Sequence, residues 1–327
     1  MPRNTEQKIR LLALYDLLQS KTDEENPMTT QEIISALEER GISVTRKTLY
    51  QDFDLLNKHG YDVVCVRGRS NRYFVGYRKF ERPEVQMLLN AIGTTQTLSA
   101  NKTEILVKKL LELLGAGEAD QLREIVPNNE TKHSNERVYY SMDAITTAIL
   151  KKKKLSFLYF DYGINGKREY RKNGWRYTVN PLGMAYSANQ LYLICYHDKY
   201  VKPAHYRIDR MDEVRVETKG ITQLKEFENF DLNAYRQELF DMYGGEKMEV
   251  RLIFPQDLLE IAIDRFGEGI TPISNGDGEY IVYTTVQVSK TFFSWLTTFE
   301  GQVRIDYPQT VKDQYAEFVK KLAENLK

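Results

Sequence analysis

Four short segments rich in β-branched and aromatic residues constrain the fold more than any other feature of the chain. They are LSFLYFDY at 155–162, RYTVNPLGMAYS at 176–187, QLYLICYH at 190–197 and AHYRIDRMDEVRV at 204–216. Glycines, asparagines and Asn-Gly pairs separate several of them and favour tight turns. A helix from Ser141 that ends in LKKKK comes first, and its lysines suit a solvated helix end better than a nucleic-acid patch. A short helix and about five closely spaced strands predict a small twisted β-barrel.

The length and the charge distribution predict several domains. A chain of 327 residues is too long for one ordinary core. The formal net charge is zero, but residues 134–220 carry 16 basic against 9 acidic residues, whereas 221–327 carry 11 against 18. This asymmetry predicts either an anion-binding module or two surfaces that attract one another, with the acidic unit docked on the basic block of the same or a partner subunit.

Composition excludes several classes of protein. Apolar residues make up 42% and aromatic residues 12%, which is enough to form cores and argues against global disorder. No run approaches the roughly 18 apolar residues of a membrane helix, and the first residues do not resemble a signal peptide. Cys65 and Cys195 are the two cysteines, too few for a disulfide scaffold. We therefore expect a cytoplasmic protein without a membrane partner.

The N-terminal segment predicts a DNA-binding unit. Apolar periodicity indicates a helix over 5–20, and TTQE forms a capping box with Thr29 as N-cap and Glu32 three residues later. That second helix ends at Gly41, and Thr45 is the expected N-cap of a third helix, RKTLYQDFDLLNKHG. Two helices joined by a tight turn, with polar side chains at the start of the second, indicate a helix-turn-helix.

A basic hairpin follows the third helix. The run YDVVCVRGRSNRYFVGY contains two β-rich pieces around a Gly/Ser/Asn turn, and residues 46–79 hold eight basic and three acidic residues. A positively charged hairpin after a recognition helix predicts a winged helix whose wing reaches phosphates or a minor groove. The alternative for any single arginine is a solvated surface position. The expected DNA-binding residues are Arg46, Lys47, Thr48, Tyr50, Gln51, Arg67, Arg69 and Arg72.

The run VTRKTLYQDFDLL resembles the DeoR-like winged helix of bacterial regulators, in which S-x-R-T-I-Y-R-D is typical. Arg46, Thr48, Tyr50 and Asp52 match that pattern, and Gln51 stands where arginine is common. The resemblance therefore implies a base preference that differs from that of such regulators.

The motif HYRIDRM at 205–211 raises the question of why two arginines lie three residues apart. On a strand, His205, Arg207 and Asp209 would share one face, with Tyr206, Ile208 and Arg210 on the other. One reading pairs the arginines with Asp209 and Asp212. The other is an anion site, because guanidinium groups hold phosphate and neighbouring tyrosines stack on bases. The interleaved tyrosines are Tyr159, Tyr192, Tyr196 and Tyr206.

The runs VNPLGMAY, QLYLICY and HYRIDRM together resemble the WYL domain, with its PLGL strand, its WYL triplet and its F-R-L-D-R-I motif. The matching positions are Pro181, Leu182, Gly183, Tyr192, Leu193, Arg207, Asp209 and Arg210, and Leu191 replaces the tryptophan. The resemblance implies a small Sm/SH3-like β-barrel that senses nucleic-acid-like or nucleotide ligands. The expected ligand-binding residues are Tyr192, His205, Arg207 and Arg210, with Arg176 and Tyr159 as further candidates.

The remaining segments complete an α+β multidomain architecture. Residues 1–79 form the predicted winged helix, 80–136 a helical connector with a linker at 127–136, and 137–220 the WYL sensor. Residues 221–327 are read as strand, helix, two strands around SNGDGE, helix, strand and helix, which predicts a ferredoxin-like unit. It corresponds to the C-terminal extension (WCX) of WYL regulators, and we expect dimerisation through it or through the connector.

No motif predicts catalysis or a cofactor. The histidines are His59, His133, His197 and His205, and none has the spacing of a zinc site or of HExxH. A Walker loop and a GxSxG elbow are absent from the sequence, and SNGDG fits a hairpin turn better than a calcium loop. We expect no enzyme activity, no metal and no cofactor. Asp and Glu are abundant enough to hide a carboxylate pair, so a hydrolase stays a third hypothesis.

Two functions compete. The first is a ligand-responsive transcription regulator, a homodimer that binds a palindromic double-stranded operator and an anionic nucleotide or single-stranded nucleic acid. The second is a nucleic-acid-binding accessory protein for a DNA-processing or phage-defence system. A palindromic footprint favours the first, and DNA binding without sequence preference favours the second.

Overall fold

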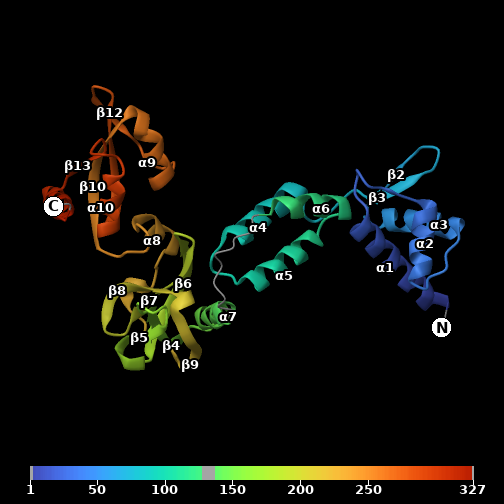
Figure 1. The fold of residues 1–327 in the computed structure, drawn as a ribbon, viewed down its shortest axis with the longest axis horizontal. Coiled ribbons are helices and arrows are strands. Elements are labelled where there is room, and N and C mark those ends of the chain that lie inside the picture. The colour runs from blue at the N-terminus through green and yellow to red at the C-terminus, as the bar shows by residue number, and fades with distance from the viewer. Residues whose placement is uncertain (1–2, 127–136, 326–327) are drawn as a thin grey trace. The chain divides into compact units, whose positions relative to one another are not determined.

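The computed structural model describes residues 3–126 and 137–325 and shows an α+β protein, which confirms the class expected from the sequence. The chain divides into two compact units, residues 1–136 and 137–327, which are described separately below. Figure 1 shows the order of their helices and strands along the chain. The expected linker at 127–136, with His133, lies outside the described residues.

The first unit begins with three helices, α1 (Arg3–Lys21), α2 (Thr30–Glu39) and α3 (Arg46–Lys58). The capping box at α2 forms as expected, because the Thr29 side chain accepts from the Glu32 N–H and Glu32 accepts from the Thr29 N–H. Thr45 caps α3 in the same way by accepting from the Thr48 N–H. Local sequence therefore determines where both helices start.

A small antiparallel sheet packs with these helices in the first unit. Its strands are β1 (Met28–Thr29), β2 (Val63–Val66) and β3 (Arg72–Val75), in the order β1-β3-β2. A single core joins the sheet to the three helices, and Leu14, Leu18, Ile33, Leu37, Leu49 and Phe53 belong to it. This core fixes α3 and the β2–β3 hairpin on one scaffold.

The rest of the first unit is helical: α4 (Arg82–Thr94), α5 (Ala100–Leu111) and α6 (Ala116–Ile125). Its core of Val85, Leu89, Leu111, Leu114 and Leu122 is separate from that of α1–α3. The carboxylate of Asp23 accepts from the N–H groups of Gly117 and Glu118 in the first turn of α6. This contact ties the helical segment to the loop after α1.

The second unit opens with α7 (Arg137–Leu150) and a barrel-like sheet (Figure 1). Six strands follow in its described residues: β4 (Lys153–Tyr162), β5 (Arg168–Tyr170), β6 (Tyr177–Ser187), β7 (Gln190–His197), β8 (Tyr200–Arg207) and β9 (Met211–Gly220). The order is β5-β4-β6-β7-β8, and β9 pairs with β4. Aromatic and aliphatic side chains of β4, β6, β7 and β8 fill the core together with α7.

Three details of this region differ from the expectation. The chain forms six strands where about five were expected. Helix α7 ends at Leu150, so that Lys153 and Lys154 begin β4 and the four lysines are not one helix end. HYRIDRM is not a continuous strand, because β8 ends at Arg207 and residues Ile208–Arg210 form a 3-10 turn, η2. The alternation of faces therefore stops after Arg207.

The last part of the chain follows a short turn, η3 (Lys225–Phe227), and helix α8 (Leu232–Glu238). Its elements are β10 (Glu246–Pro255), η4 (Gln256–Leu258), α9 (Leu259–Phe266), β11 (Ile273–Gly276), β12 (Glu279–Val288), α10 (Lys290–Thr297), β13 (Arg304–Tyr307) and α11 (Gln309–Glu324). The sheet is antiparallel in the order β11-β12-β10-β13. These elements have the order predicted from the sequence.

The segment around α8 packs on the outer face of β6 and β7. Ala185 and Ile194 of the sheet contact Leu239 and Met242 after α8. Gly183 lies so close to Leu232 that an added Cβ would come within 2.6 Å of its methyl group. The side chains of this contact are apolar, unlike the charge-driven docking considered for the acidic and basic blocks.

Candidate functional site

The N-terminal half of α3 presents a polar face to solvent. Four of the side chains expected to bind DNA are exposed on it: Arg46, Lys47, Tyr50 and Gln51. Thr48 is half-buried, and its hydroxyl lies 2.9 Å from that of Thr45. The opposite face of the helix carries Leu49, Phe53 and Leu56, which are buried. The helix is thus held by its apolar face while its polar face stays free for a partner.

A buried ion pair fixes α3 against α1. Arg10 donates from Nε and Nη2 to the two carboxylate oxygens of Asp52, at 2.6 and 2.9 Å. The Asp52 side chain is only 3% exposed, and Arg10 retains 17%. Sequence reasoning assigned Asp52 to a motif but missed its partner, because no local pattern links two residues this far apart in the chain.

The β2–β3 hairpin places the other expected DNA-binding side chains at its tip. Arg67, Arg69 and Arg72 are all exposed. The ring of Tyr73, next to Arg72, stacks on Phe53 of α3 with centroids 4.3 Å apart. This stacking lies in the core that α3 and the hairpin share, so both sets of side chains are carried by one scaffold.

Arg207 and Tyr192 are cross-strand neighbours on β8 and β7. Both lie on the outer face, because Leu193 and Tyr206 in the adjacent positions face the barrel core. Arg207 donates from Nε and Nη2 to Asp209 at 3.0 and 2.8 Å, so the pairing considered for Arg207 forms. Its backbone N–H donates to the Tyr159 hydroxyl at 3.2 Å.

Arg210 pairs with Asp161 of β4 and not with Asp212. Its Nη1 donates to Asp161 Oδ1 at 3.1 Å. Arg171, in the turn η1 (Arg171–Gly174), donates to the same carboxylate at 2.5 and 3.0 Å. These hydrogen bonds lower the pKa of Asp161, with Arg171 as the larger cause. The Nε of Arg210 is buried and has no hydrogen-bond partner.

These contacts define an arginine cluster of Asp161, Arg171, Arg207, Asp209 and Arg210. It contains three guanidinium groups and two carboxylates, so it carries one excess positive charge. Arg171 also lies over the ring of Tyr159, 5.0 Å from its centroid. Sequence reasoning missed Asp161 and Arg171, since neither belongs to HYRIDRM, although Asp161 lies on the same strand as the candidate Tyr159. The basic run REYRKNGW was the only local signal.

The tyrosines differ in what they offer to a ligand. Tyr159 and Tyr206 are buried in the barrel core beside Phe157 and Tyr177, so their rings are not free to stack on a base. Tyr196 is also buried, stacked on Phe227. Tyr192 is half-buried next to Arg207, and burial raises the pKa of its hydroxyl. Among these rings Tyr192 is the one that solvent reaches appreciably.

His205 lies on the same outer face of β8 as Arg207, but its ring is engaged by α8 and the segment that follows it. Its Nε2 lies 3.0 Å from the Tyr235 hydroxyl, and it lines a cavity of about 940 Å³ with Lys202, Gly244 and Gln287. Burial lowers the pKa of His205 to about 4. At neutral pH its imidazole is therefore uncharged, and it adds no positive charge to an anion site.

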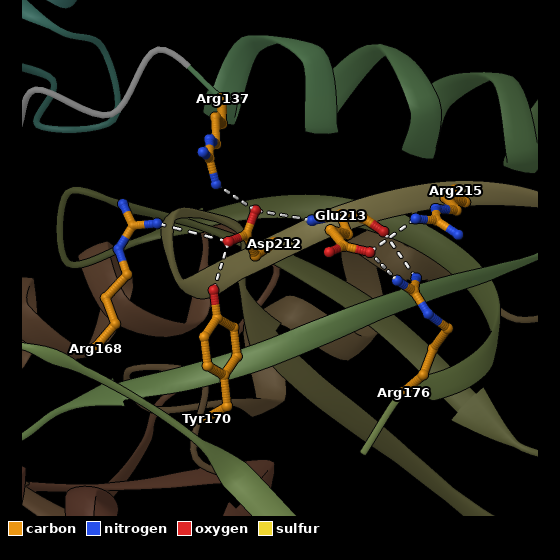
Figure 2. A network of polar contacts seen from close by, with 7 residues as sticks. All are labelled: Arg137, Arg168, Tyr170, Arg176, Asp212, Glu213 and Arg215. Atoms are coloured by element: carbon orange, nitrogen blue, oxygen red, sulfur yellow. Dashed lines mark hydrogen bonds and ion pairs between the residues drawn. The ribbon is translucent and has the colours of Figure 1, made fainter. Parts of the chain in front are cut away.

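Arg176 belongs to a different network, which Figure 2 shows around Asp212 and Glu213 of β9. Arg176 and Arg215 share the Glu213 carboxylate, at 2.5 and 2.8 Å. Asp212 accepts from Arg137 at 2.6 Å and from the Tyr170 hydroxyl at 2.7 Å, and Arg168 approaches it at 3.7 Å. The structure therefore brings together Tyr159, Tyr192, Arg207 and Arg210. Arg176 is engaged in another network, and His205, on the same strand face as Arg207, bonds to Tyr235.

Neither a metal site nor a membrane-spanning helix occurs in the described residues. No group of three or more His, Cys, Asp or Glu side chains there is arranged to hold a metal ion. None of the helices in residues 3–126 and 137–325 combines the length and the apolar character needed to cross a membrane.

Comparison with known proteins gives one family match. Residues 141–216 match the family model of the WYL domain, which confirms the resemblance for this part of the chain. No curated protein matches the chain. Among solved structures, proteasome accessory factor B/C (PafBC) of Arthrobacter aurescens is similar at 16% identity and a TM-score of 0.30. That match covers 96% of this chain and 48% of the other, so the chain spans about half the length of PafBC.

Proposed function

We propose that the protein is a ligand-responsive transcription regulator. Residues 1–79 bind operator DNA as a winged helix of the DeoR-like kind, and the WYL region senses an anionic nucleotide or single-stranded nucleic acid. The observation that carries the proposal is the arginine cluster in the matched WYL region, where guanidinium groups outnumber the carboxylates that pair with them.

The DNA-binding half rests on a surface formed by two neighbouring elements. Lys47, Tyr50 and Gln51 of α3 are exposed and suit base edges in the major groove. Arg67, Arg69 and Arg72 on the hairpin suit phosphates or a minor groove. The stacked Phe53 and Tyr73 rings hold these two sets in a fixed relation, as a winged helix requires.

The sensing half rests on unsatisfied hydrogen-bonding capacity. Asp161 receives bonds from two arginines, and the buried Nε of Arg210 donates to nothing. The side chains of Arg171, Arg207 and Arg210 are 49%, 24% and 29% exposed, so a phosphate oxygen would meet guanidinium groups that solvent reaches, in the planar geometry they favour. Tyr192, beside Arg207, is only partly buried and offers its ring to the base of the same ligand.

Response to ligand follows if the ligand changes the spacing of two winged helices in a dimer. We propose a homodimer that uses the connector or the C-terminal unit and reads an inverted repeat with half-sites separated by whole helical turns. Light scattering tests the oligomeric state directly. A monomer that still gives a sharp footprint contradicts the dimeric part of the proposal.

The experiment that tests the function is selection of binding sites from random double-stranded DNA with the purified full chain. The regulator predicts enrichment of one inverted repeat, and Lys47→Ala combined with Gln51→Ala abolishes that enrichment. Binding to all sequences alike would instead support the accessory-protein alternative. A matched control, Gln19→Ala combined with Lys21→Ala at the end of α1, changes the same residue types away from α3 and leaves the enrichment unchanged.

A further inference from the structure

The arginine cluster contains its own counter-ion, Asp161, which occupies the position of an incoming anion. Two guanidinium groups from different elements, Arg171 of η1 and Arg210 of η2, donate to this one carboxylate. The side chain of Asp161 remains 39% exposed, so it lies at the surface and not under the arginines. A ligand that approaches from solvent therefore meets the Asp161 charge together with Arg171, whose side chain is 49% exposed.

The charge balance of the cluster has a chemical consequence. With Arg171, Arg207 and Arg210 against Asp161 and Asp209, one positive charge remains to be neutralised. Two further charges of opposite sign lie nearby and outside this hydrogen-bonded set: Lys172, over the ring of Tyr177, and Glu169, the cross-strand neighbour of Asp161. A singly charged anion balances the cluster, whereas a doubly charged one adds a repulsive interaction with Asp161.

We propose that Asp161 is a resident counter-ion that selects ligands with a singly charged phosphodiester over ligands with a terminal phosphomonoester. The inference rests on the proposed sensing function and adds the class of phosphate to it. It also assigns ligand binding to Arg171. When the charge of Asp161 is removed, the guanidinium group of Arg171 turns from Asp161 to the ligand.

The conformation of η1 places Arg171 at the start of a tight turn. Lys172 and Asn173, which follow it, have φ values of 51° and 54°, in the left-handed region that side chains other than glycine seldom adopt. Gly174 has a φ of 78°. In this turn the Arg171 guanidinium group contacts Asp161 and the Tyr159 ring, and an anion that binds Arg171 would compete with the Asp161 carboxylate for it.

The test compares two ligands that share a base and differ in charge. Adenosine 3′,5′-cyclic monophosphate carries one negative charge, and adenosine 5′-monophosphate carries close to two at pH 8 because its second pKa is about 6. Dissociation constants are measured by titration calorimetry with the full chain and with Asp161→Asn, which keeps the shape of the side chain and removes its charge.

Asp161→Asn should raise the affinity for the two ligands by different factors. Coulomb energy is proportional to the product of the charges, so the factor gained by the doubly charged ligand should be about the square of the factor gained by the other. We expect gains of about threefold for the cyclic nucleotide and about tenfold for the monophosphate, both smaller at high salt. Asp161→Glu, which keeps the charge, should leave both constants within about twofold of the original protein.

Two further variants separate the causes. Glu213→Gln removes a carboxylate that is likewise shared by two arginines, in the network of Figure 2, and should change neither constant. Combining Asp161→Asn with Arg171→Ala should cancel most of the gain if Arg171 contacts the ligand. Gains that persist in that double variant would exclude Arg171 from ligand binding.

The outcomes distinguish this inference from the proposed function. If neither nucleotide binds any variant, or if binding survives Arg207→Ala combined with Arg210→Ala, the sensing function fails and the inference fails with it. If that double change abolishes binding while Asp161→Asn gives no gain, or equal gains for both ligands, the sensing function stands and the counter-ion role is overturned. A gain in affinity cannot arise from misfolding, so the Asp161→Asn result is decisive.

Discussion

Arg10 of α1 holds Asp52 of α3 through two hydrogen bonds, at 2.6 and 2.9 Å, inside the first unit. The pair lies on the buried side of α3, the helix proposed to read DNA, and Asp52 directly follows Tyr50 and Gln51 in that helix. The orientation of α3 thus depends on the carboxylate of Asp52, which is almost completely shielded from solvent.

Changing Arg10 to Met should lower the free energy of unfolding of the first unit by about 2–4 kcal/mol. The reason is that Asp52 would be left as a buried carboxylate without its partner. Urea denaturation followed by circular dichroism measures the loss. The control is Arg40→Met, which removes the exposed pair between Arg40 and Asp16 and should cost only ~0–1 kcal/mol. Equal losses in the two variants would mean that the Arg10 pair is not buried in solution.

Gln51 and Arg69 should affect DNA binding in different ways. Gln51→Ala should relax the base preference at one position per half-site, by ~1–3 kcal/mol if the contact is bidentate. Arg69→Ala should weaken binding to all sequences alike and reduce the salt dependence by roughly one unit for each phosphate that Arg69 neutralises. Binding to a panel of single-base operator variants at several salt concentrations separates the two effects. An unchanged preference in Gln51→Ala would refute the assignment of α3 as the recognition helix.

The stability of the second unit should fall as pH decreases from about 6.5 to about 4, partly because of His205. Burial lowers its pKa to about 4 in the folded protein, whereas an unfolded chain keeps a value near 6.5. Between these values the unfolded state binds a proton that the folded state does not, so acid favours unfolding. The contribution should reach up to ~3 kcal/mol and level off below pH 4.

Unfolding of His205→Gln measured over the same pH range isolates this contribution. Protonation of carboxylates with lowered pKa values, such as Asp161 and Asp198, also destabilises the folded protein in acid, but by the same amount in both proteins. The variant should therefore show a flatter profile between pH 6.5 and 4. Parallel profiles for the two proteins would show that His205 is not buried as a neutral imidazole.

Local features of the sequence predicted the parts of the fold that depend on neighbouring residues. The capping box of Thr29 and Glu32 formed because its two partners lie three positions apart on the same turn. The buried face of α3 followed from helical periodicity, and the order of elements after residue 246 followed from alternating patterns. In each case the interactions that determine the structure are close in sequence.

The arginine cluster could be predicted only in part, because its geometry depends on distant contacts. Arg207 and Arg210 were identified, but the strand expected through both ends at Arg207, where η2 turns Arg210 toward Asp161, 49 residues earlier. Arg171 reaches the same carboxylate from a separate turn. Arg176 was expected at this site because of its charge, yet Glu213 binds it in another network. Residue type alone does not decide which carboxylate an arginine meets.

The central claim is that an anion bound at Arg207 and Arg210 changes the affinity for DNA. Its most direct test measures binding of the selected operator by fluorescence anisotropy, with and without adenosine 3′,5′-cyclic monophosphate, for the original protein and for Arg207→Ala combined with Arg210→Ala. We predict equal operator affinity for the two proteins without nucleotide, and a response to nucleotide in the original protein alone. Arg215→Ala, in the network of Figure 2, should respond as the original does. A response that persists in the double variant would contradict the account.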